Sequence, residues 1–408
     1  MGQTEKKAVI YGGGNIGRGF IGQLFYESGY RTAFVDIDKA LIGQLNKAGE
    51  YPLKFTDSVG AGSEIVVKNV RGIDGSAENI DEVAEAVSQA DIMAASVGAG
   101  VLKFIMQPIA AGINKRFAGE NARPLNIILC ENLIGADKIM REGVREYIHE
   151  DFQALYDGQI GFVEASVGRT VPTQTDEMKA GNPLRIVAES YKSLPVDRAG
   201  FKGEVPEIAG MTAYTPFEYF IRRKLYLHNM GHAVCAYLGD IFGYEYIWQA
   251  VQDPYIELIA SKIMQRSALA LASIYQADMR DLSRYIENLI YRFGDKALGD
   301  TVKRVGNDLK RKLAPNDRII GAYKICAETG VPVNYLCLAI AAAVNFKGDK
   351  LSGSLEHILN EAGSFDLIVG EDFALVQKYD GIIKGGADIR ELFDAVKSDE
   401  NIINAETR

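Results

Sequence analysis

The sequence contains few of the cysteine and histidine residues that stabilise small or secreted proteins through disulfides or metal sites. Only four of its 408 residues are cysteine and four are histidine, and no two cysteines form a CxxC pair. This spacing gives neither a disulfide framework nor the Cys/His arrangement of a structural zinc site. We therefore expect reduced thiols in the core. The cysteines are Cys130, Cys235, Cys326 and Cys337.

Long apolar runs are also missing. The longest, Tyr335–Val344, has ten residues, whereas a membrane-spanning helix needs about 20. No apolar segment near the N-terminus resembles a signal peptide. The sequence therefore predicts a cytoplasmic protein with no membrane partner.

Positive charge is in deficit. The chain has 45 Lys and Arg against 54 Asp and Glu, which gives a formal net charge of −9 at pH 7. Such a surface repels a phosphate backbone except at local basic patches. We expect a small-molecule ligand and no nucleic-acid partner, and nothing in the sequence implies an oligomer.

The composition that remains is that of an ordinary globular protein, with 47% hydrophobic and 24% charged residues. A length of 408 residues corresponds to two or three domains of about 150 residues. Proline and glycine punctuate residues 195–210, where an alternation of strand and helix patterns gives way to long helical patterns. We predict one domain over residues 1–200 and a mainly α-helical domain over residues 201–408.

The first domain alternates short apolar runs with amphipathic stretches, which predicts an α/β fold with a parallel, doubly wound sheet. Glu50–Phe55 and Ser63–Val70, joined by Gly60-Ala61-Gly62, predict an inserted hairpin. Further strands are expected at Gly161–Val171 and Pro183–Glu189. The alternating strands are Lys7–Tyr11, Thr32–Val35, Asp91–Val97 and Leu125–Cys130, and the helices are Ile16–Ser28, Lys39–Lys47, Ile80–Ser88 and Leu102–Phe117.

Strand patterns nearly vanish in the second half, where apolar residues recur with the period of an α-helix. The predicted helices are Pro216–Gly243, Pro254–Tyr275, Asp317–Thr329, Asn334–Phe346 and Ile389–Val396.

A glycine-rich turn follows the first strand. Gly12, Gly14 and Gly17 form a GxGxxG pattern at the opening of a helix, where glycines permit a tight turn, approach of a pyrophosphate and close helix packing. The second strand leads to Asp36, nineteen residues after Gly17, where a carboxylate accepts hydrogen bonds from the ribose of NAD and repels the 2′-phosphate of NADP. This order predicts a Rossmann-type domain that binds NAD. The expected contacts are Gly12, Gly13, Gly14, Asn15, Ile16, Gly17 and Asp36.

Each of these features has a simpler interpretation. A glycine-rich turn can merely connect a strand to a helix, and Asp36 could cap the next helix, for which Asp38 is equally suitable. Val97 and Gly98 end a predicted strand where such folds bring the backbone to the cofactor, and we expect both to contact NAD, although they could form only a turn.

Two of the four histidines lie in the segment Arg223–His232. At 100° per residue, Lys224, His228, Asn229 and His232 share one broad face of a helix over about 12 Å. An amine, an amide and an imidazole suit alcohol–ketone interconversion, because a base takes the hydroxyl proton while neutral donors hold the oxygen. Lys224 can be that base only if burial or neighbouring positive charge favours its neutral form.

The same face also has a structural interpretation. Lys224 could extend along apolar surface to water, with His228 and His232 as satisfied core or surface groups. The i, i+4 spacing of the two histidines fits a zinc pair, but no third ligand accompanies them. We therefore predict no metal site.

At these residues the sequence resembles the polyol-specific long-chain dehydrogenases, of which the K-x4-N-x2-H pattern of Lys224, Asn229 and His232 is a mark. The resemblance covers most of the chain and implies an N-terminal Rossmann domain, a helical C-terminal domain and a site between them. It is carried by Gly12–Gly22, Cys130-Glu131-Asn132, Gly161-Phe162-Val163 with Arg169 and Val171-Pro172, Arg223–Gly239, and Asp317-Arg318 with Ile340–Ala343.

The resemblance implies that Lys224 is the general base, that Asn132 and Asn229 polarise the reacting oxygen, and that His232 orients the substrate. It implies NAD-dependent interconversion of a polyol phosphate and a ketose phosphate, with mannitol 1-phosphate and fructose 6-phosphate as the expected pair. An unphosphorylated polyol or a sugar acid as substrate, or a non-catalytic dinucleotide sensor, remain as alternatives. Retention of the four site residues argues against the sensor.

One departure from the family concerns the substrate. Relatives usually carry Val-Asp-Arg where this chain has Val167-Gly168-Arg169, so a carboxylate is missing and a changed polyol is possible. A phosphate group on the substrate would also need local cations on this acidic chain. The segment that contains Lys312 and Arg318 is basic, although a solvated basic face is an equally simple interpretation of it. The cations that we expect to bind the substrate are Arg169, Arg223, Lys312 and Arg318.

Overall fold

The computed structural model describes residues 5–406 except 57–61, 120–122, 134 and 369. The chain divides into two compact units, Met1–Phe217 and Glu218–Arg408. This division falls later than the predicted boundary at residues 200–201. The reason is that strand β11 (Met211–Tyr214) pairs in parallel with β10 (Leu194–Asp197), which ties the punctuated segment to the first unit.

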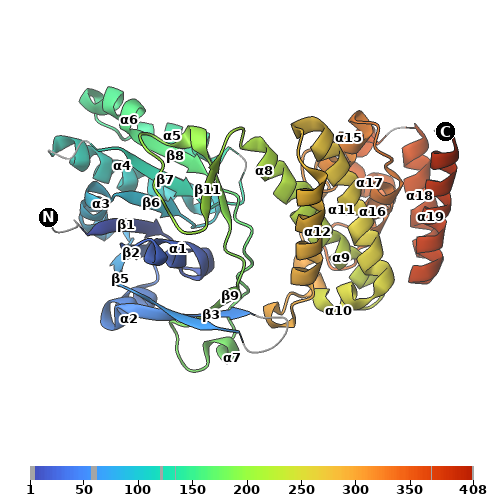
Figure 1. Ribbon diagram of the computed structural model, residues 1–408, viewed down its shortest axis with the longest axis horizontal. Helices are drawn as coiled ribbons and strands as arrows, with labels where there is room; N and C mark the ends of the chain where they lie inside the picture. Colours follow the sequence, from blue (N-terminus) through green and yellow to red (C-terminus); the bar gives the residue numbers. More distant parts are fainter. Residues whose placement is uncertain (1–4, 57–61, 120–122, 134, 369, 407–408) are drawn as a thin grey trace. The chain divides into compact units, whose positions relative to one another are not determined.

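The first unit is built on a six-stranded sheet with the strand order β5-β2-β1-β6-β7-β8, in which every pair is parallel. This confirms the predicted doubly wound α/β domain (Figure 1). Most strands begin or end within a few residues of their predicted bounds. They are β1 (Lys6–Tyr11), β2 (Tyr30–Asp36), β5 (Val70–Asp74), β6 (Ile92–Ala95), β7 (Leu125–Leu129) and β8 (Ile160–Glu164).

Both faces of this sheet are covered, which explains why its strands are continuous apolar runs. Val9 of β1 packs in one core with Val87 of α3 and Ile109 of α4. Ile10, on the opposite face, packs in another core with Phe20 and Leu24. The helices of the unit are α1 (Gly22–Glu27), α2 (Lys39–Ala48), α3 (Ile80–Gln89), α4 (Leu102–Ala118), α5 (Ala136–Arg145), α6 (Gln153–Gln159) and α7 (Asp176–Lys179).

The predicted hairpin is present but ends differently. Strands β3 (Glu50–Thr56) and β4 (Glu64–Lys68) are antiparallel, and β9 (Ile186–Glu189) adds to β3 to make a three-stranded sheet. Gly60 and Ala61 of the predicted connection lie outside the described residues. The prediction of one strand over Ser63–Val70 is wrong, because Asn69 adopts a φ of 58° and turns the chain into β5 of the larger sheet. Asparagine tolerates this left-handed conformation better than most residues.

The predicted strand Gly161–Val171 is also too long. Strand β8 ends at Glu164, and the chain then leaves the sheet, where the Ser166 amide donates to the Pro195 carbonyl.

The second unit is helical, as predicted. Helix α11 (Pro254–Tyr275) has its predicted bounds, because Asp253 caps it and a proline at the first helical position has no amide to satisfy. Helix α16 (Asn334–Val344) contains the longest apolar run, and all its residues are buried, as expected of a helix that is apolar on every side. Helix α15 begins at Ile320 and leaves Asp317 and Arg318 in the preceding turn.

The remaining elements of this unit surround α16 and α11. They are α8 (Glu218–Arg223), η6 (Lys224–Asn229), α9 (Met230–Ile241), α10 (Ile247–Gln252), α12 (Met279–Phe293), η7 (Lys296–Leu298), α13 (Val302–Gly306), α14 (Leu309–Lys312), α15 (Ile320–Glu328), α17 (Leu355–Glu361), α18 (Gly370–Lys384) and α19 (Ile389–Glu406). Within the described part of the chain, no helix is long and apolar enough to cross a membrane.

Candidate active site

The glycine-rich turn lies at the carboxyl end of β1. Gly12 has a φ of 97°, and a side chain there would come within 2.5 Å of the Ser96 carbonyl oxygen. A side chain at Gly17 would overlap the Gly12 carbonyl, whereas Gly14 is exposed and faces open space. Two glycines thus permit the turn, and the third leaves an open cradle for a ligand. These are the roles that the pattern predicts for dinucleotide binding.

The helix that follows this turn begins with Asn15 and Ile16 in α-helical conformation and then contains a π-helix, Gly17–Ile21, before α1. The sequence pattern did not indicate this. Arg18 is buried and supports the turn from behind, because its Nε donates to the Gly13 carbonyl at 2.6 Å and its Nη1 to the Leu184 carbonyl at 2.7 Å. The side-chain amide nitrogen of Asn15, Nδ2, donates to the Pro172 carbonyl at 3.0 Å.

Asp36 ends β2 beside the turn. Its Oδ2 accepts a hydrogen bond from the Gly13 amide at 2.7 Å, and its Oδ1 accepts from the Asp38 amide at 3.0 Å. The cap of α2 is Asp38, which accepts from the amides of Ala40 and Leu41. The interpretation of Asp36 as a helix cap is therefore wrong.

Val97 and Gly98 follow β6 at the same edge of the sheet. Their amides donate to Glu131 Oε1 at 2.8 and 3.1 Å, so both are occupied by a side chain of the Cys130-Glu131-Asn132 motif. Burial raises the pKa of Glu131, and the two hydrogen bonds partly oppose this. Sequence reasoning missed Glu131, although its motif had been noted. Asn132 is exposed at the carboxyl end of β7.

Arg169, which was predicted to bind the substrate, has its guanidinium buried inside the first unit. Its Nε donates to the Tyr191 carbonyl at 2.6 Å, and its Nη1 donates to the Gly19 carbonyl at 2.9 Å and to Gln23 Oε1 at 2.7 Å. A side chain at Gly168 would approach the Tyr191 ring to 3.0 Å. The aspartate usual in relatives would therefore need Tyr191 to shift.

In the second unit, the segment with Lys224 and Asn229 is a π-helix between α8 and α9. The prediction of one regular α-helix over Pro216–Gly243 is therefore wrong, and the angles computed at 100° per residue do not apply to this turn. Single π-helical turns inside α-helices occur frequently at functional sites.

The two histidines of this segment have different surroundings. His228 is buried, and its Nδ1 has no hydrogen-bond partner among the described residues. Burial first, and then the charges of Arg292, His232, Lys224 and Arg318, lower the pKa of His228 well below its ordinary value. His228 is therefore neutral near pH 7, beside several cations.

His232 is held on two sides. Its ring stacks on Phe293 with a centroid separation of 4.9 Å and an interplanar angle of 9°. Its Nε2 lies 3.3 Å from Oδ2 of Asp300, whose other oxygen pairs with Arg304. Sequence reasoning missed Asp300 and Arg304, because they lie more than sixty residues after His232 without a motif.

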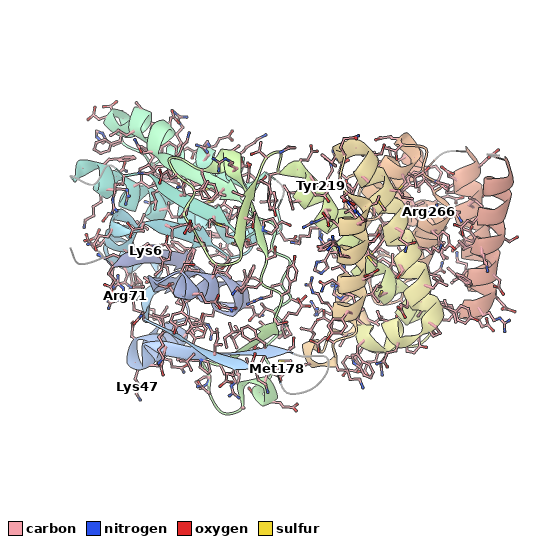
Figure 2. The ribbon with its side chains drawn as sticks, viewed as in Figure 1. Lys6, Lys47, Arg71, Met178, Tyr219 and Arg266 are labelled. Atoms are coloured by element: carbon pink, nitrogen blue, oxygen red, sulfur yellow. The ribbon has the colours of Figure 1, made fainter. Side chains whose placement is uncertain are left out.

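Of two further predicted substrate cations in this unit, Lys312 is hydrogen-bonded internally, whereas Arg223 lies against aromatic rings and its buried Nε makes no hydrogen bond among the described residues. Lys312 is buried, and its Nζ donates to the carbonyls of Val305, at 2.6 Å, and Asn307. Burial lowers the pKa of Lys312 to about 8. The guanidinium of Arg223 lies over the rings of Tyr219, Phe220 and Tyr285, 4.5–5.6 Å from their centroids, and Figure 2 labels Tyr219 in this unit.

Arg318 differs from these two in one respect, because its charge acts on a residue of the π-helix Lys224–Asn229. Its Nε donates to Asp317 Oδ1 at 2.8 Å, and its charge acts on His228. Arg318 is itself buried and pairs with Asp317, so packing alone does not separate it from the other predicted substrate cations. In the part of the chain that the structure describes, no group of three or more His, Cys, Asp or Glu side chains could hold a metal ion.

Comparisons with known proteins show the family to which the chain belongs. The model of the mannitol dehydrogenase Rossmann domain matches residues 6–210, and that of the mannitol dehydrogenase C-terminal domain matches residues 217–357. Mannitol-1-phosphate 5-dehydrogenase of Brevibacillus brevis is 39% identical over 358 residues, which cover 87% of this chain and 90% of the relative.

Solved structures share the fold at low identity. One is Pseudomonas fluorescens mannitol 2-dehydrogenase in a ternary complex with NAD and D-mannitol (TM-score 0.69, 15% identity, 97% of this chain and 95% of the other). Another is a substrate-free D-sorbitol dehydrogenase (TM-score 0.75, 17% identity, 98% and 94%). With both family models matched in order along most of its length, the chain belongs to the mannitol dehydrogenase family.

Proposed function

We propose that this chain interconverts mannitol 1-phosphate and fructose 6-phosphate with NAD, and that Lys224 is the general base. The coarser statement, a polyol dehydrogenase that acts on a CH–OH group with NAD, follows from its family. The observation that carries the finer proposal is the 39% identity, over 87% of the chain, to a mannitol-1-phosphate 5-dehydrogenase.

The first unit has the features needed to hold NAD, which supplies a hydride acceptor when it is bound. The exposed backbone at Gly14 and the amide groups at the start of the following helix, at Asn15 and Ile16, suit a pyrophosphate. Asp36 accepts two hydrogen bonds, and a carboxylate offers about four lone-pair sites. It therefore keeps capacity for the hydroxyls of a ribose.

The second unit has the groups needed at the substrate. As base, Lys224 would take the proton of the hydroxyl that becomes the carbonyl, which requires its neutral amine form. The charges of Arg292 and Arg318 act on His228, which belongs to the same π-helix as Lys224. Neighbouring cations of this kind favour the neutral amine form of Lys224. Asn229 would donate its amide hydrogens to the developing alkoxide. The family resemblance implies the same role for Asn132, which belongs to the first unit.

Arg318 would bind the phosphate of the substrate. We choose it among the four because its charge acts on His228, in the π-helix that carries Lys224, whereas Arg169 and Lys312 donate to carbonyls of their own units. A hydrogen bond between a guanidinium and a phosphate contributes roughly 1.5–3 kcal/mol. A phosphorylated substrate should therefore be preferred over its unphosphorylated counterpart by roughly 10- to 150-fold for each such contact.

The test is to reduce fructose 6-phosphate and fructose with NADH and to follow the absorbance at 340 nm. We expect kcat/KM to be far higher for fructose 6-phosphate, and rising salt to weaken that preference by screening the charge attraction. Equal kcat/KM for the two sugars would favour the unphosphorylated polyol. An absence of turnover with any ketose, despite NADH binding, would favour the dinucleotide sensor.

A further inference from the structure

His232 lies at the centre of a small polar and aromatic cluster in the second unit. The π-helix η6 contributes His228, whose ring centroid is 6.4 Å from that of His232. Helix α12 contributes Phe293, on which His232 stacks. The segment between η7 and α13 contributes Asp300, and α13 contributes Arg304.

Asp300 is a fixed group. Only 7% of its side chain is exposed. Its backbone carbonyl accepts from the Ile247 amide, and the next residue, Thr301, bridges to Tyr246. Burial acts to raise the pKa of Asp300, but the hydrogen bond with His232 and the charge of Arg304 outweigh it and hold that pKa below its ordinary value. Asp300 is therefore an ionised acceptor near neutral pH.

We propose that Asp300 is a positioning residue that keeps the Nε2 proton on His232 and so makes Nδ1 the acceptor for a substrate hydroxyl. A carboxylate only accepts hydrogen bonds, so the neutral imidazole must carry its proton on the nitrogen that faces it. Stacking on Phe293 fixes the plane of the ring. His232 then accepts a hydrogen bond from the substrate, whereas Asn229 donates one.

Arg304 makes this assignment testable, because a guanidinium only donates hydrogen bonds. In Asp300→Asn, the single amide oxygen should turn to Arg304, which occupies one oxygen of the carboxylate. The NH2 group would then face His232 Nε2 and require it to accept. The substitution should therefore move the imidazole proton to Nδ1, with little change in shape.

The first readout is NMR of the histidine side chains in the full-length protein. The chain has four histidines, so long-range proton–nitrogen spectra at alkaline pH can be assigned with His232→Gln as reference. We expect the Nε2–H tautomer for His232 in wild type and the Nδ1–H tautomer in Asp300→Asn. In the double variant Asp300→Asn/Arg304→Ala the amide is free to turn its oxygen to His232, so the Nε2–H tautomer should return.

The second readout is turnover, and it rests on the proposed function. We expect Asp300→Asn to lower kcat roughly 10- to 100-fold, because a misplaced proton removes one hydrogen bond to the substrate, and the double variant to recover part of it. In a His232→Ala background the same substitution should have no further effect, since Asp300 acts through His232. Thermal denaturation should be nearly unchanged.

Asp295→Asn is the matched control. Asp295 is a buried carboxylate of the same loop, and it accepts from the Ala297 amide at the start of η7. We expect this variant to keep the wild-type tautomer of His232 and nearly normal kcat.

An unchanged tautomer in Asp300→Asn would overturn the proposal, as would an equal loss of activity in the His232→Ala background. A wild-type protein without activity on polyols or ketoses would instead overturn the proposed function. The NMR comparison would still decide the role of Asp300.

Discussion

The charged residues that the sequence predicted to bind ligands have different kinds of hydrogen-bond partner in the structure. Arg169 and Lys312 donate to carbonyl oxygens of their own unit, so their charge stabilises packing. Asp36 accepts from two backbone amides beside an exposed glycine turn and keeps lone pairs for a ligand. Residue type and spacing predicted ligand binding for all three residues. Only their hydrogen-bond partners in the structure distinguish a structural role from a role in ligand binding.

The first prediction concerns Asp36 and the choice of cofactor. Asp36→Ala should weaken NAD binding by about 1.5–3 kcal/mol, since a charge-assisted hydrogen bond is lost. The substitution should also reduce the preference for NAD over NADP, since the carboxylate that repels the 2′-phosphate of NADP is removed. Fluorescence titration with both cofactors measures this.

Asp38→Ala is the control for this prediction. It removes the cap of α2 and should cost about 1 kcal/mol of stability without changing cofactor preference. Equal efficiency of the wild-type protein with NAD and NADP would contradict the assignment of Asp36.

At the level of secondary-structure elements, side chains fix the ends of strands and short helices. Glu131, after β7, holds the two amides that follow β6. Lys312, at the end of α14, holds carbonyls of Val305 in α13 and of Asn307 just after it. Neither link joins residues that a local sequence pattern relates.

For the β6–β7 link, we predict that Glu131→Ala raises KM for NAD about 5- to 100-fold, because the Val97–Gly98 turn loses its acceptor. Glu131→Gln keeps an acceptor oxygen and should change KM much less. The matched control is Glu164→Ala, since Glu164 ends β8 and accepts from the Gly135 amide at 2.8 Å. An equal rise of KM in the control would show a general loosening of the sheet edge.

For the α13–α14 link, Lys312→Met should lower the free energy of unfolding by about 1.5–3 kcal/mol, because a charged donor to two carbonyls is lost. It should leave KM for fructose 6-phosphate unchanged. Chemical denaturation and steady-state kinetics measure the two effects. A raised KM with unchanged stability would restore Lys312 as a phosphate ligand.

The same variant gives a test by pH. The folded pKa of Lys312 is about 8, below the ordinary value of 10.5. Between these values the unfolded chain binds more protons than the folded one, so stability rises with pH over this range. The stability advantage of wild type over Lys312→Met should therefore grow from pH 8 to pH 10.5.

For the whole molecule, the glycine turn and Asp36 belong to the first unit, and the proposed base Lys224 belongs to the second. Lys224→Ala should lower kcat about 10²- to 10⁴-fold and leave the Kd for NAD unchanged, because the glycine turn and Asp36 belong to the other unit. Calorimetric titration and initial rates measure these quantities. Lys296→Ala, which removes a lysine that lies over the Trp248 ring, is the control. Near-normal turnover of Lys224→Ala at neutral pH would support the interpretation of Lys224 as a solvated side chain.

Much of the fold followed from local patterns. Buried strands were recognised as apolar runs, and α11 was recognised with its bounds from its helical pattern, because both signals depend on nearby residues. The left-handed turn at Asn69 and the π-helix at Lys224–Asn229 were not, because each depends on how the chain must meet neighbouring elements. A uniform 100° per residue could not place Lys224, His228 and Asn229.

The sequence by itself determined the parallel Rossmann sheet, the helical second unit, the cofactor turn with Asp36 and the family, since each depends on motifs with fixed spacing. Only the tertiary structure decided which charged groups are available to a ligand. Arg169 and Lys312 donate to carbonyls of their own units, Asp300 pairs with His232 and Arg304, and Glu131 accepts from the turn that follows β6. The physical reason is that a charge is satisfied by the donors and acceptors that folding brings to it. For Arg169, Glu131 and His232 these come from segments far apart in the sequence.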